Sequence, residues 1–322
     1  MKKISEYRSE IENAINELIF PDGELDKLYS PIKYALSAGG KRLRPVLTLM
    51  GADAFGGDMK VAIFPAIGIE TFHNFTLLHD DVMDKSDMRR GRPTVHKKYD
   101  ENTAILSGDT MLTLATQYVG RVSESILSQV LGAFNDMAIK VYEGQRLDMD
   151  FEEMTQVSVP QYLKMIEYKT GALLGASVMI GGLIGGASVK DALLMYDYGR
   201  YIGIAFQIQD DWLDTFGDAS TFGKPIGGDI NNAKKTFLYV KALSEEGQTA
   251  EALKTAFKIP AGDVRVKTVT RLYDKLGLKE ICKKEVNKYL ALALKALNET
   301  ELKQDTKESF HEFAEKLIGR KK

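Results

Sequence analysis

Apolar residues recur at helical spacing along most of the sequence, and no stretch shows the strict alternation of a half-buried β-strand. Short connections rich in Gly, Pro, Asp or Ser separate the periodic segments. No long linker, low-complexity tract or repeat of fixed period interrupts them. The pattern predicts a single all-α domain over residues 1–322. Its helices are expected over segments such as residues 7–19, 45–55, 61–84, 102–119, 125–150, 160–186, 189–215 and 235–257.

One uncharged segment, residues 171–189, is about as long as a membrane-spanning helix. Its six glycines and two serines make it only weakly apolar, and polar residues flank both sides. Small residues permit close backbone approach between helices, so we expect a helix buried inside the protein and no membrane span. Near the N-terminus acidic residues interleave with basic ones, which predicts no signal peptide and a cytoplasmic protein.

The charges of the chain nearly cancel, because 43 basic and 45 acidic residues give a formal net charge of -2 over 322 residues. Such a chain has no global field for nucleic acid or an anionic membrane, so any anion site must be local. Hydrophobic residues make up 44% of the chain, enough for a substantial core. The single cysteine, Cys282, excludes an internal disulfide and a cysteine-rich metal site, and it fits a reducing compartment.

The pattern Asp-Asp-x-x-Asp occurs twice. The two clusters are Asp80, Asp81 and Asp84 in DDVMD, and Asp210, Asp211 and Asp214 in DDWLD. Each follows an apolar run and so lies late on its predicted helix, where the helix dipole disfavours negative charge. Solvated helix ends are the ordinary explanation for acidic clusters, but acids favour the first turn. Carboxylates held together at this end indicate bound cations, and an all-oxygen site with few ligands suits Mg²⁺.

Basic residues stand beside glycine-rich turns near both clusters. They are Lys41, Arg42 and Arg44 in GGKRLRP, Arg89, Arg90 and Arg92 in MRRGRP, and later Lys169, Lys224, Lys234 and Lys235. Backbone amides and forked guanidiniums in such turns approach phosphate oxygens closely. A solvated surface charge is the ordinary explanation for any one of these residues. Together with the carboxylates they predict a site for diphosphates, and two basic sets indicate two substrates.

These motifs resemble the all-trans isoprenyl diphosphate synthases, the polyprenyl synthetase family that includes farnesyl and geranylgeranyl diphosphate synthases. The resemblance covers most of the chain and follows one order: GGKRLRP at 39–45, HNFTLLHDDVMD at 73–84, RRGRPTVH at 89–96, GQRLD at 144–148, KTGAL at 169–173, FQIQDDWLD at 206–214 and GKPIGGD at 223–229. It implies one all-α domain of long, mostly antiparallel helices around a deep central cavity, the isoprenoid synthase fold. It also implies a homodimer.

The resemblance implies a role for each matched residue, beginning with a cluster of three Mg²⁺ ions. The main ligands are then Asp80, Asp84 and Asp210, supported through waters by Asp81, Asp211 and Asp214. The implied contacts to isopentenyl diphosphate are Lys41, Arg44, His73 and Arg90. Those to the allylic diphosphate are Arg89, Lys169, Thr170, Gln207, Lys224 and Lys234. Lys169, Thr170 and Gln207 are further implied to lie near the reacting carbons, as catalytic residues.

The implied reaction is ionisation of the allylic diphosphate, attack on the allyl cation by the double bond of isopentenyl diphosphate, and removal of a proton by the released pyrophosphate. It needs no protein nucleophile, and the sequence offers no defensible Ser-His-Asp arrangement. A terpene cyclase is one alternative, but the basic set GGKRLRP and the second aspartate cluster argue against it. A non-catalytic prenyl synthase subunit is another, but such chains typically lose aspartates that are intact here.

The resemblance also bears on product length. In the family the growing chain extends from the metal site along the helix of the first cluster. The resemblance makes Phe75, five positions before Asp80, and Phe72, about one turn deeper, the floor of the pocket. A C20 product is favoured, then C15, with a longer-chain synthase as the third possibility. Ordinary helical core is the alternative for Phe75, and His79 is expected to be a packing residue.

Overall fold

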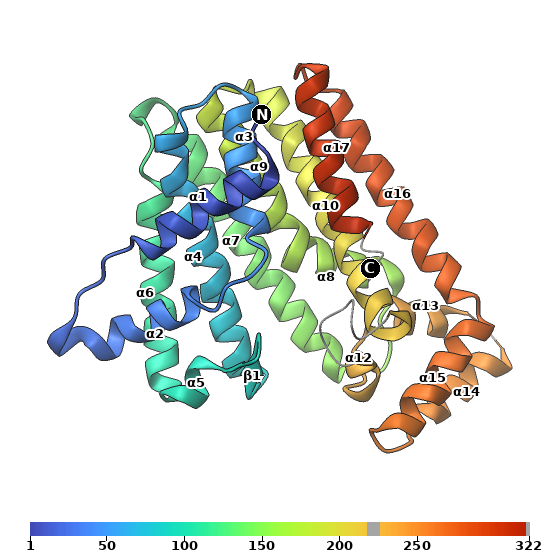
Figure 1. The fold of residues 1–322 in the computed structure, drawn as a ribbon. Coiled ribbons are helices and arrows are strands. Elements are labelled where there is room, and N and C mark those ends of the chain that lie inside the picture. The colour runs from blue at the N-terminus through green and yellow to red at the C-terminus, as the bar shows by residue number, and fades with distance from the viewer. Residues whose placement is uncertain (218–225, 246, 320–322) are drawn as a thin grey trace. The chain divides into compact units, whose positions relative to one another are not determined.

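The computed structural model describes residues 1–217, 226–245 and 247–319, and almost all regular structure in these ranges is helical (Figure 1). The all-α prediction is therefore confirmed. Lys224 and the basic C-terminal tail beyond Gly319 lie outside the described residues.

The chain divides into two compact units. Unit 1 comprises Met1–Asp136 and Ala176–Met195, and unit 2 comprises Met137–Gly175 and Tyr196–Lys322. The boundaries fall inside helices α7 (Glu124–Glu153), α9 (Ala172–Gly185) and α10 (Val189–Phe216). The single domain expected from the sequence stays a prediction.

Unit 1 is built from helices and one very short hairpin. Its elements are α1 (Ile4–Asn16), η1 (Gly23–Leu25), α2 (Asp26–Leu36), α3 (Leu43–Ala54), α4 (Met59–Met83), β1 (Met88–Arg89), β2 (Arg92–Pro93), α5 (Val95–Lys98) and α6 (Glu101–Val119). Helices α4 and α6 lie side by side (Figure 1). A Cβ added at Gly68 of α4 would lie only 2.8 Å from the Ala115 carbonyl oxygen of α6, so the small residue lets the helices approach closely.

The uncharged segment at 171–189 forms α9, which has 14 residues. Its apolar side chains are buried, and a Cβ added at Gly181 would lie 2.1 Å from the carbonyl oxygen of Thr48 in α3. The expectation of a buried helix with close backbone contacts is thus confirmed. Among the described helices, α4 is the one long and apolar enough to cross a membrane, and 67% of its most apolar window is buried inside the protein, as in a core helix.

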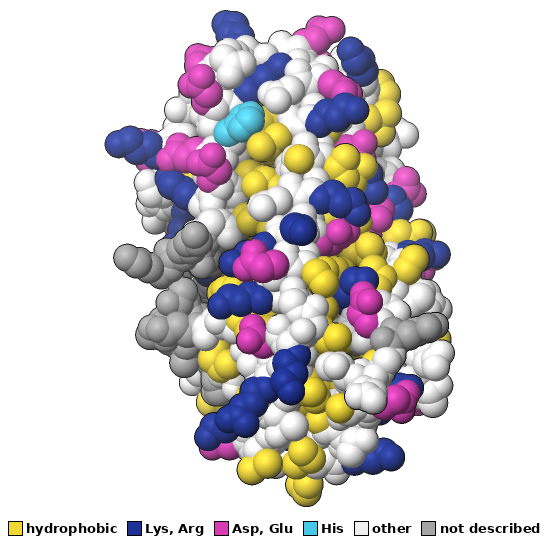
Figure 2. Space-filling view, turned by 90° about the vertical axis from the view of Figure 1, so that its right-hand side faces the viewer, with side chains coloured by type: hydrophobic (Ala, Val, Ile, Leu, Met, Phe, Trp, Pro, Cys, Tyr) yellow, Lys and Arg dark blue, Asp and Glu magenta, His cyan; other side chains and the backbone are white. Residues whose placement is uncertain are grey.

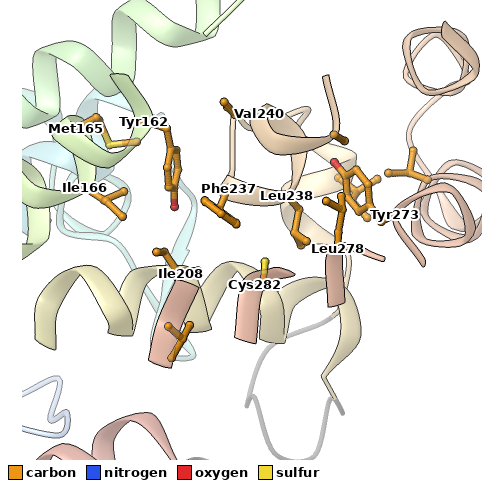
Figure 3. Close-up of a cluster of buried hydrophobic side chains, with 14 of the residues drawn as sticks. Tyr162, Met165, Ile166, Ile208, Phe237, Leu238, Val240, Tyr273, Leu278 and Cys282 are labelled. Atoms are coloured by element: carbon orange, nitrogen blue, oxygen red, sulfur yellow. The ribbon is translucent and has the colours of Figure 1, made fainter. Parts of the chain in front are cut away.

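Unit 2 surrounds a second apolar core. Its further elements are α8 (Val159–Ile166), the π-helical turn η2 (Glu167–Gly171), α12 (Gly228–Asn231), α13 (Phe237–Ser244), α14 (Gln248–Ala256), α15 (Asp263–Lys275), α16 (Leu278–Asn298) and α17 (Gln304–Ile318). Figure 3 shows Tyr162 beside Phe237 in this core, with its hydroxyl end directed toward the helix that carries Ile208. On the face of the molecule in Figure 2, basic and acidic side chains are interspersed.

The structure corrects several predicted boundaries. The expected helix over 160–186 is interrupted by η2, and the expected helix over 235–257 is divided because α13 ends at Ser244 and α14 begins at Gln248. Gly247, with φ of 123°, adopts a conformation that a helix cannot contain. The β1–β2 hairpin was not predicted, since two-residue strands are too short to show alternation.

Candidate active site

The first aspartate cluster lies at the C-terminal end of α4. Asp84 is the C-cap residue, and its N–H donates to the Asp80 carbonyl, so the cluster lies late on its helix as predicted. Asp81 is buried, Asp80 is half-buried and Asp84 is exposed. Arg89 Nε lies 2.8 Å from both carboxylate oxygens of Asp81. Burial raises the pKa of Asp81, and the Arg89 hydrogen bonds and charge oppose that shift.

The hairpin positions three arginines beside this cluster. Arg90 has φ of 51° and is followed by Gly91 with φ of 73°, which makes the tight turn between β1 and β2. The guanidinium of Arg90 donates to the Gly39 carbonyl, and a Cβ added at Gly40 would lie 2.9 Å from its Cζ. A small cavity of about 40 Å³ is lined by Asp81, Arg89, Arg90 and Arg92 among others. The structure thus brings RRGRP together with the glycines of GGKRLRP.

Arg44 and His73 form a second feature of unit 1. Arg44 Nη1 lies 3.2 Å from His73 Nε2, which pairs α3 with α4. Burial lowers the pKa of Arg44 to about 10. Burial, followed by the charges of Arg44, Arg90 and Arg89, holds the pKa of His73 well below its usual range. Arg44 Nε is buried and has no hydrogen-bond partner among the described residues. Two predicted isopentenyl diphosphate contacts are therefore adjacent, in a strongly cationic environment.

Arg42, between Lys41 and Arg44 in the sequence, has a different role. Its side chain is buried, and Nη1 lies 2.6 Å from Glu70 Oε1. Nε lies 3.0 Å from Glu12 Oε1, and Nη2 donates to the Leu36 carbonyl at 2.7 Å. Every nitrogen of this guanidinium is engaged within the protein. Arg42 therefore fixes the loop to α1, α2 and α4, whereas the side chain of Lys41 is exposed.

The second cluster lies in the last turns of α10. Asp211 is buried and accepts from the Tyr162 hydroxyl at 2.5 Å, the Phe237 amide at 2.8 Å and Gln207 Nε2 at 3.2 Å. Burial, reinforced by the charge of Asp229, raises the pKa of Asp211 to about 7 despite these three donors. Asp211 is thus bound into the core of unit 2.

The other two members of this cluster differ in exposure. Asp214 is buried, and its carboxylate accepts from the Asp229 amide at 3.0 Å, which fixes the start of α12. Asp210 is half-buried. Asp211 and Asp214 accept hydrogen bonds from other elements of unit 2, and Asp210 is the member more open to solvent.

The predicted catalytic residues Lys169 and Thr170 lie in the π-helical turn η2. Such turns are rare and are found frequently at functional sites. Lys169 Nζ contacts Asp148 Oδ2 at 2.6 Å, and a Cβ added at Gly144 would lie 2.3 Å from the Lys169 amide nitrogen. Gly144 and Asp148, spaced i, i+4 on α7, therefore both face this turn. The motif GQRLD thus supplies the glycine and the aspartate that face Lys169.

A cavity of about 130 Å³ joins these residues in unit 2. Thr170 Oγ1 donates to Gln207 Oε1 at 3.3 Å. The lining residues are Asp148, Tyr162, Met165, Ile166, Lys169, Thr170, Gln207, Asp211, Asp229, Lys234, Lys235 and Thr236. The structure thus brings together the predicted Lys169, Thr170, Gln207 and Lys234. Sequence reasoning missed Tyr162 and Asp229. Asp148 had a usable signal in its spacing from Gly144, but a tyrosine inside an apolar helix has none.

Known proteins resemble this chain in sequence. Residues 25–276 match the model of the polyprenyl synthetase family. The geranylgeranyl diphosphate synthase of Sulfolobus acidocaldarius is 38% identical over 95% of this chain and 94% of its own length.

Solved structures agree. A crystal structure of a geranylgeranyl pyrophosphate synthase is 40% identical, covers 100% of both chains and superposes with a TM-score of 0.94. That of geranylgeranyl pyrophosphate synthase from Corynebacterium glutamicum, complexed with isoprenyl diphosphate and magnesium, is 26% identical over 99% of this chain and 98% of its own, with a TM-score of 0.85. The chain therefore belongs to the polyprenyl synthetase family.

Proposed function

We propose that this chain is a short- to medium-chain all-trans isoprenyl diphosphate synthase. This prenyltransferase joins isopentenyl diphosphate head to tail to an allylic diphosphate. The observation that carries the proposal is the cationic environment of Arg44 and His73 in unit 1, where the buried Arg44 Nε has no partner among the described residues. A buried donor without an acceptor costs about 1–3 kcal/mol, and an anionic ligand would remove that cost. A diphosphate would supply the acceptor oxygen that Arg44 Nε lacks among the described residues.

The allylic diphosphate is assigned to the cavity of unit 2. Lys169 and Lys234 provide point charges for its oxygens, while Thr170 and Gln207 lie on the same wall. Charge that develops on the departing pyrophosphate is stabilised by preorganised cations, which is the largest contribution to catalysis of this kind. Burial lowers the pKa of Lys235, which lines the same cavity. Arg89, held by Asp81, and Lys224 complete the expected set of cations for this substrate.

The carboxylates fit Mg²⁺ as the proposed cofactor, with three ions per active site. They offer only oxygen donors, and the three expected main ligands, Asp80, Asp84 and Asp210, are the half-buried or exposed members of their clusters. The described residues contain no preformed group of three metal-binding side chains. Mg²⁺ needs few protein ligands, because it commonly keeps several waters and shares phosphate oxygens. Mg²⁺ would supply Lewis-acid stabilisation of the pyrophosphate leaving group.

The supporting carboxylates have a distinct proposed part. Asp81, Asp211 and Asp214 hold Arg89, Gln207 and the start of α12 in place through the hydrogen bonds described above. Deprotonation after condensation is assigned to the released pyrophosphate, as the family resemblance implies. Apolar helices would keep water away from the allyl cation.

We also propose a product length, an oligomeric state and a cellular location. A C20 product is favoured over C15 because Phe75, with Phe72 behind it, would limit the pocket along α4. A homodimer and a cytoplasmic location are proposed as well, the latter supported by the buried free thiol of Cys282.

Incubation of the purified protein with Mg²⁺, isopentenyl diphosphate and one of dimethylallyl, geranyl or farnesyl diphosphate tests the function. Mass spectrometry of the products should show linear chains lengthened by whole isoprene units, and chelation of the metal with EDTA should abolish them. A cyclic hydrocarbon made from the allylic substrate alone would favour a terpene cyclase. Absence of any product would favour a non-catalytic subunit.

A further inference from the structure

His79 lies one residue before the first cluster, and its surroundings in unit 1 are unusually specific. Its Nε2 lies 3.1 Å from the Ile105 carbonyl oxygen of α6. A carbonyl only accepts, so Nε2 must carry the hydrogen of this bond. The ring passes directly over Gly108, where an added Cβ would lie 2.2 Å from Nε2. Only glycine at 108 leaves room for the imidazole in this position.

The same ring contacts the aromatic residue expected to limit product length. The centroids of His79 and Phe75 are 4.8 Å apart, edge to face at 68°. Phe75 in turn packs against Phe72 at 5.6 Å, and Phe72 against Phe134 at 5.3 Å. His79, Phe75 and Phe72 are spaced by four and three residues, so they form one stripe along α4. The contacts run unbroken from α6 to Phe134.

Helix α6 can hold this stripe firmly because it contacts α4 closely at two places. Gly68 of α4 approaches the carbonyl of Ala115, and Gly108 of α6 approaches His79. The helices therefore run antiparallel, fixed near both ends of the contact. A histidine hydrogen-bonded to such a helix has little freedom to rotate, and neither has the phenyl ring packed against it.

We infer that His79 is a positioning residue for product length: α6, through the Ile105 carbonyl and the space at Gly108, holds the imidazole against Phe75 and so fixes where chain growth stops. The inference rests on the proposed function and adds to it a determinant on a second helix. His79 touches neither diphosphate in this account. Its replacement should therefore change the product and leave the first condensation with dimethylallyl diphosphate within about twofold of wild type.

His79→Ala removes the ring contact and the hydrogen bond, so Phe75 can swing aside for a longer chain. The ratio of the next longer product to the wild-type product should rise by up to about tenfold, the factor expected for loss of one aromatic pair. Gly108→Ala should have the same effect, because its methyl group displaces the imidazole. Ile105→Ala is the matched control, since it keeps the backbone carbonyl and should keep the wild-type distribution.

The path through Phe75 is tested by a double variant. Phe75→Ala alone should lengthen the product by at least one isoprene unit, and Phe72→Ala in addition should lengthen it further. Adding His79→Ala to Phe75→Ala should change nothing more, since the ring that it positions is gone. Full additivity of His79→Ala and Phe75→Ala would overturn the inference. So would a wild-type distribution in an active His79→Ala enzyme or an unchanged one in active Phe75→Ala.

A measurement without turnover separates this inference from the proposed function. In NMR spectra of the protein, the His79 ring protons should carry a ring-current shift that Phe75→Leu removes. Its absence would overturn the positioning contact even in an active synthase. Its presence in a protein that forms no linear prenyl product would contradict the proposed function and leave the contact standing.

Discussion

The two aspartate clusters share one sequence pattern, but their buried carboxylates have different hydrogen-bond partners. In unit 1 Asp81 is paired with a guanidinium, with Arg89 Nε 2.8 Å from both of its oxygens. In unit 2 the donors to Asp211 among the described residues are neutral: the Tyr162 hydroxyl, the Phe237 amide and the Gln207 side chain. Burial, reinforced by the charge of Asp229, raises the pKa of Asp211 to about 7.

The same aspartate pattern therefore occurs in two different side-chain environments. The first cluster adjoins a cavity lined by arginines, while the second adjoins a cavity lined by lysines. Forked guanidiniums suit fixed, bidentate contacts, and ammonium groups act as compact point charges. The proposed division of substrates follows this contrast, with isopentenyl diphosphate at the arginines and the leaving pyrophosphate at the lysines.

The largest change is expected when the buried ion pair of Arg42 and Glu70 in unit 1 is broken. Arg42→Met should lower the free energy of unfolding by about 3–5 kcal/mol, because Glu70 remains buried without its cation. Urea denaturation measures this change. Lys41→Met, at the exposed neighbouring position, should stay within about 0.5 kcal/mol of wild type.

The double variant Arg42→Met with Glu70→Gln serves as the check, since it removes both charges. It should be more stable than Arg42→Met alone. A loss below about 1 kcal/mol in Arg42→Met would mean that this guanidinium does not anchor the loop.

The next largest effect concerns the carboxylates assigned to metal. Asp80→Asn, Asp84→Asn and Asp210→Asn should each lower turnover by at least about 10²-fold, the scale of losing one preorganised electrostatic contact. Their thermal unfolding should remain cooperative. Asp274→Asn, an exposed carboxylate on α15, is the control and should keep wild-type turnover. Near-normal turnover of any of the three at saturating Mg²⁺ would remove that residue from the ligand set.

The smallest expected change is a pH dependence of the free energy of unfolding that comes from His73 in unit 1. The pKa of His73 is held well below its usual range in the folded protein, so below about pH 6.5 the unfolded chain binds a proton that the folded chain does not. Stability should therefore fall as pH falls below that value, by at most about 1.4 kcal/mol per pH unit from this residue. Urea titrations from pH 8 to pH 5 should show a shallower fall in His73→Gln. Parallel curves would contradict the depressed pKa.

The sequence predicted the fold well because long amphipathic helices carry their pattern in their own residues. It also placed both clusters at helix ends, and the three members expected as main ligands are the half-buried or exposed ones. The metal roles themselves stay a prediction. The π-helical turn at Lys169 was not predicted, because one extra residue in a helical turn leaves the apolar pattern unchanged and the close approach of Gly144 comes from another helix. The sequence could not distinguish the role of Arg42 from that of Arg44. The fold places Arg42 in ion pairs with Glu12 and Glu70.

Each basic set is proposed to bind its own substrate, and kinetics with each substrate varied in turn test this division. Apparent Michaelis constants for both substrates should be measured at saturating Mg²⁺ in Arg44→Ala and Lys234→Ala. Arg44→Ala should raise the constant for isopentenyl diphosphate by about 10- to 100-fold, the loss expected for a hydrogen bond to a charged group, and leave the allylic constant within about twofold. Lys234→Ala should do the reverse. Equal changes of both constants in both variants would contradict the account.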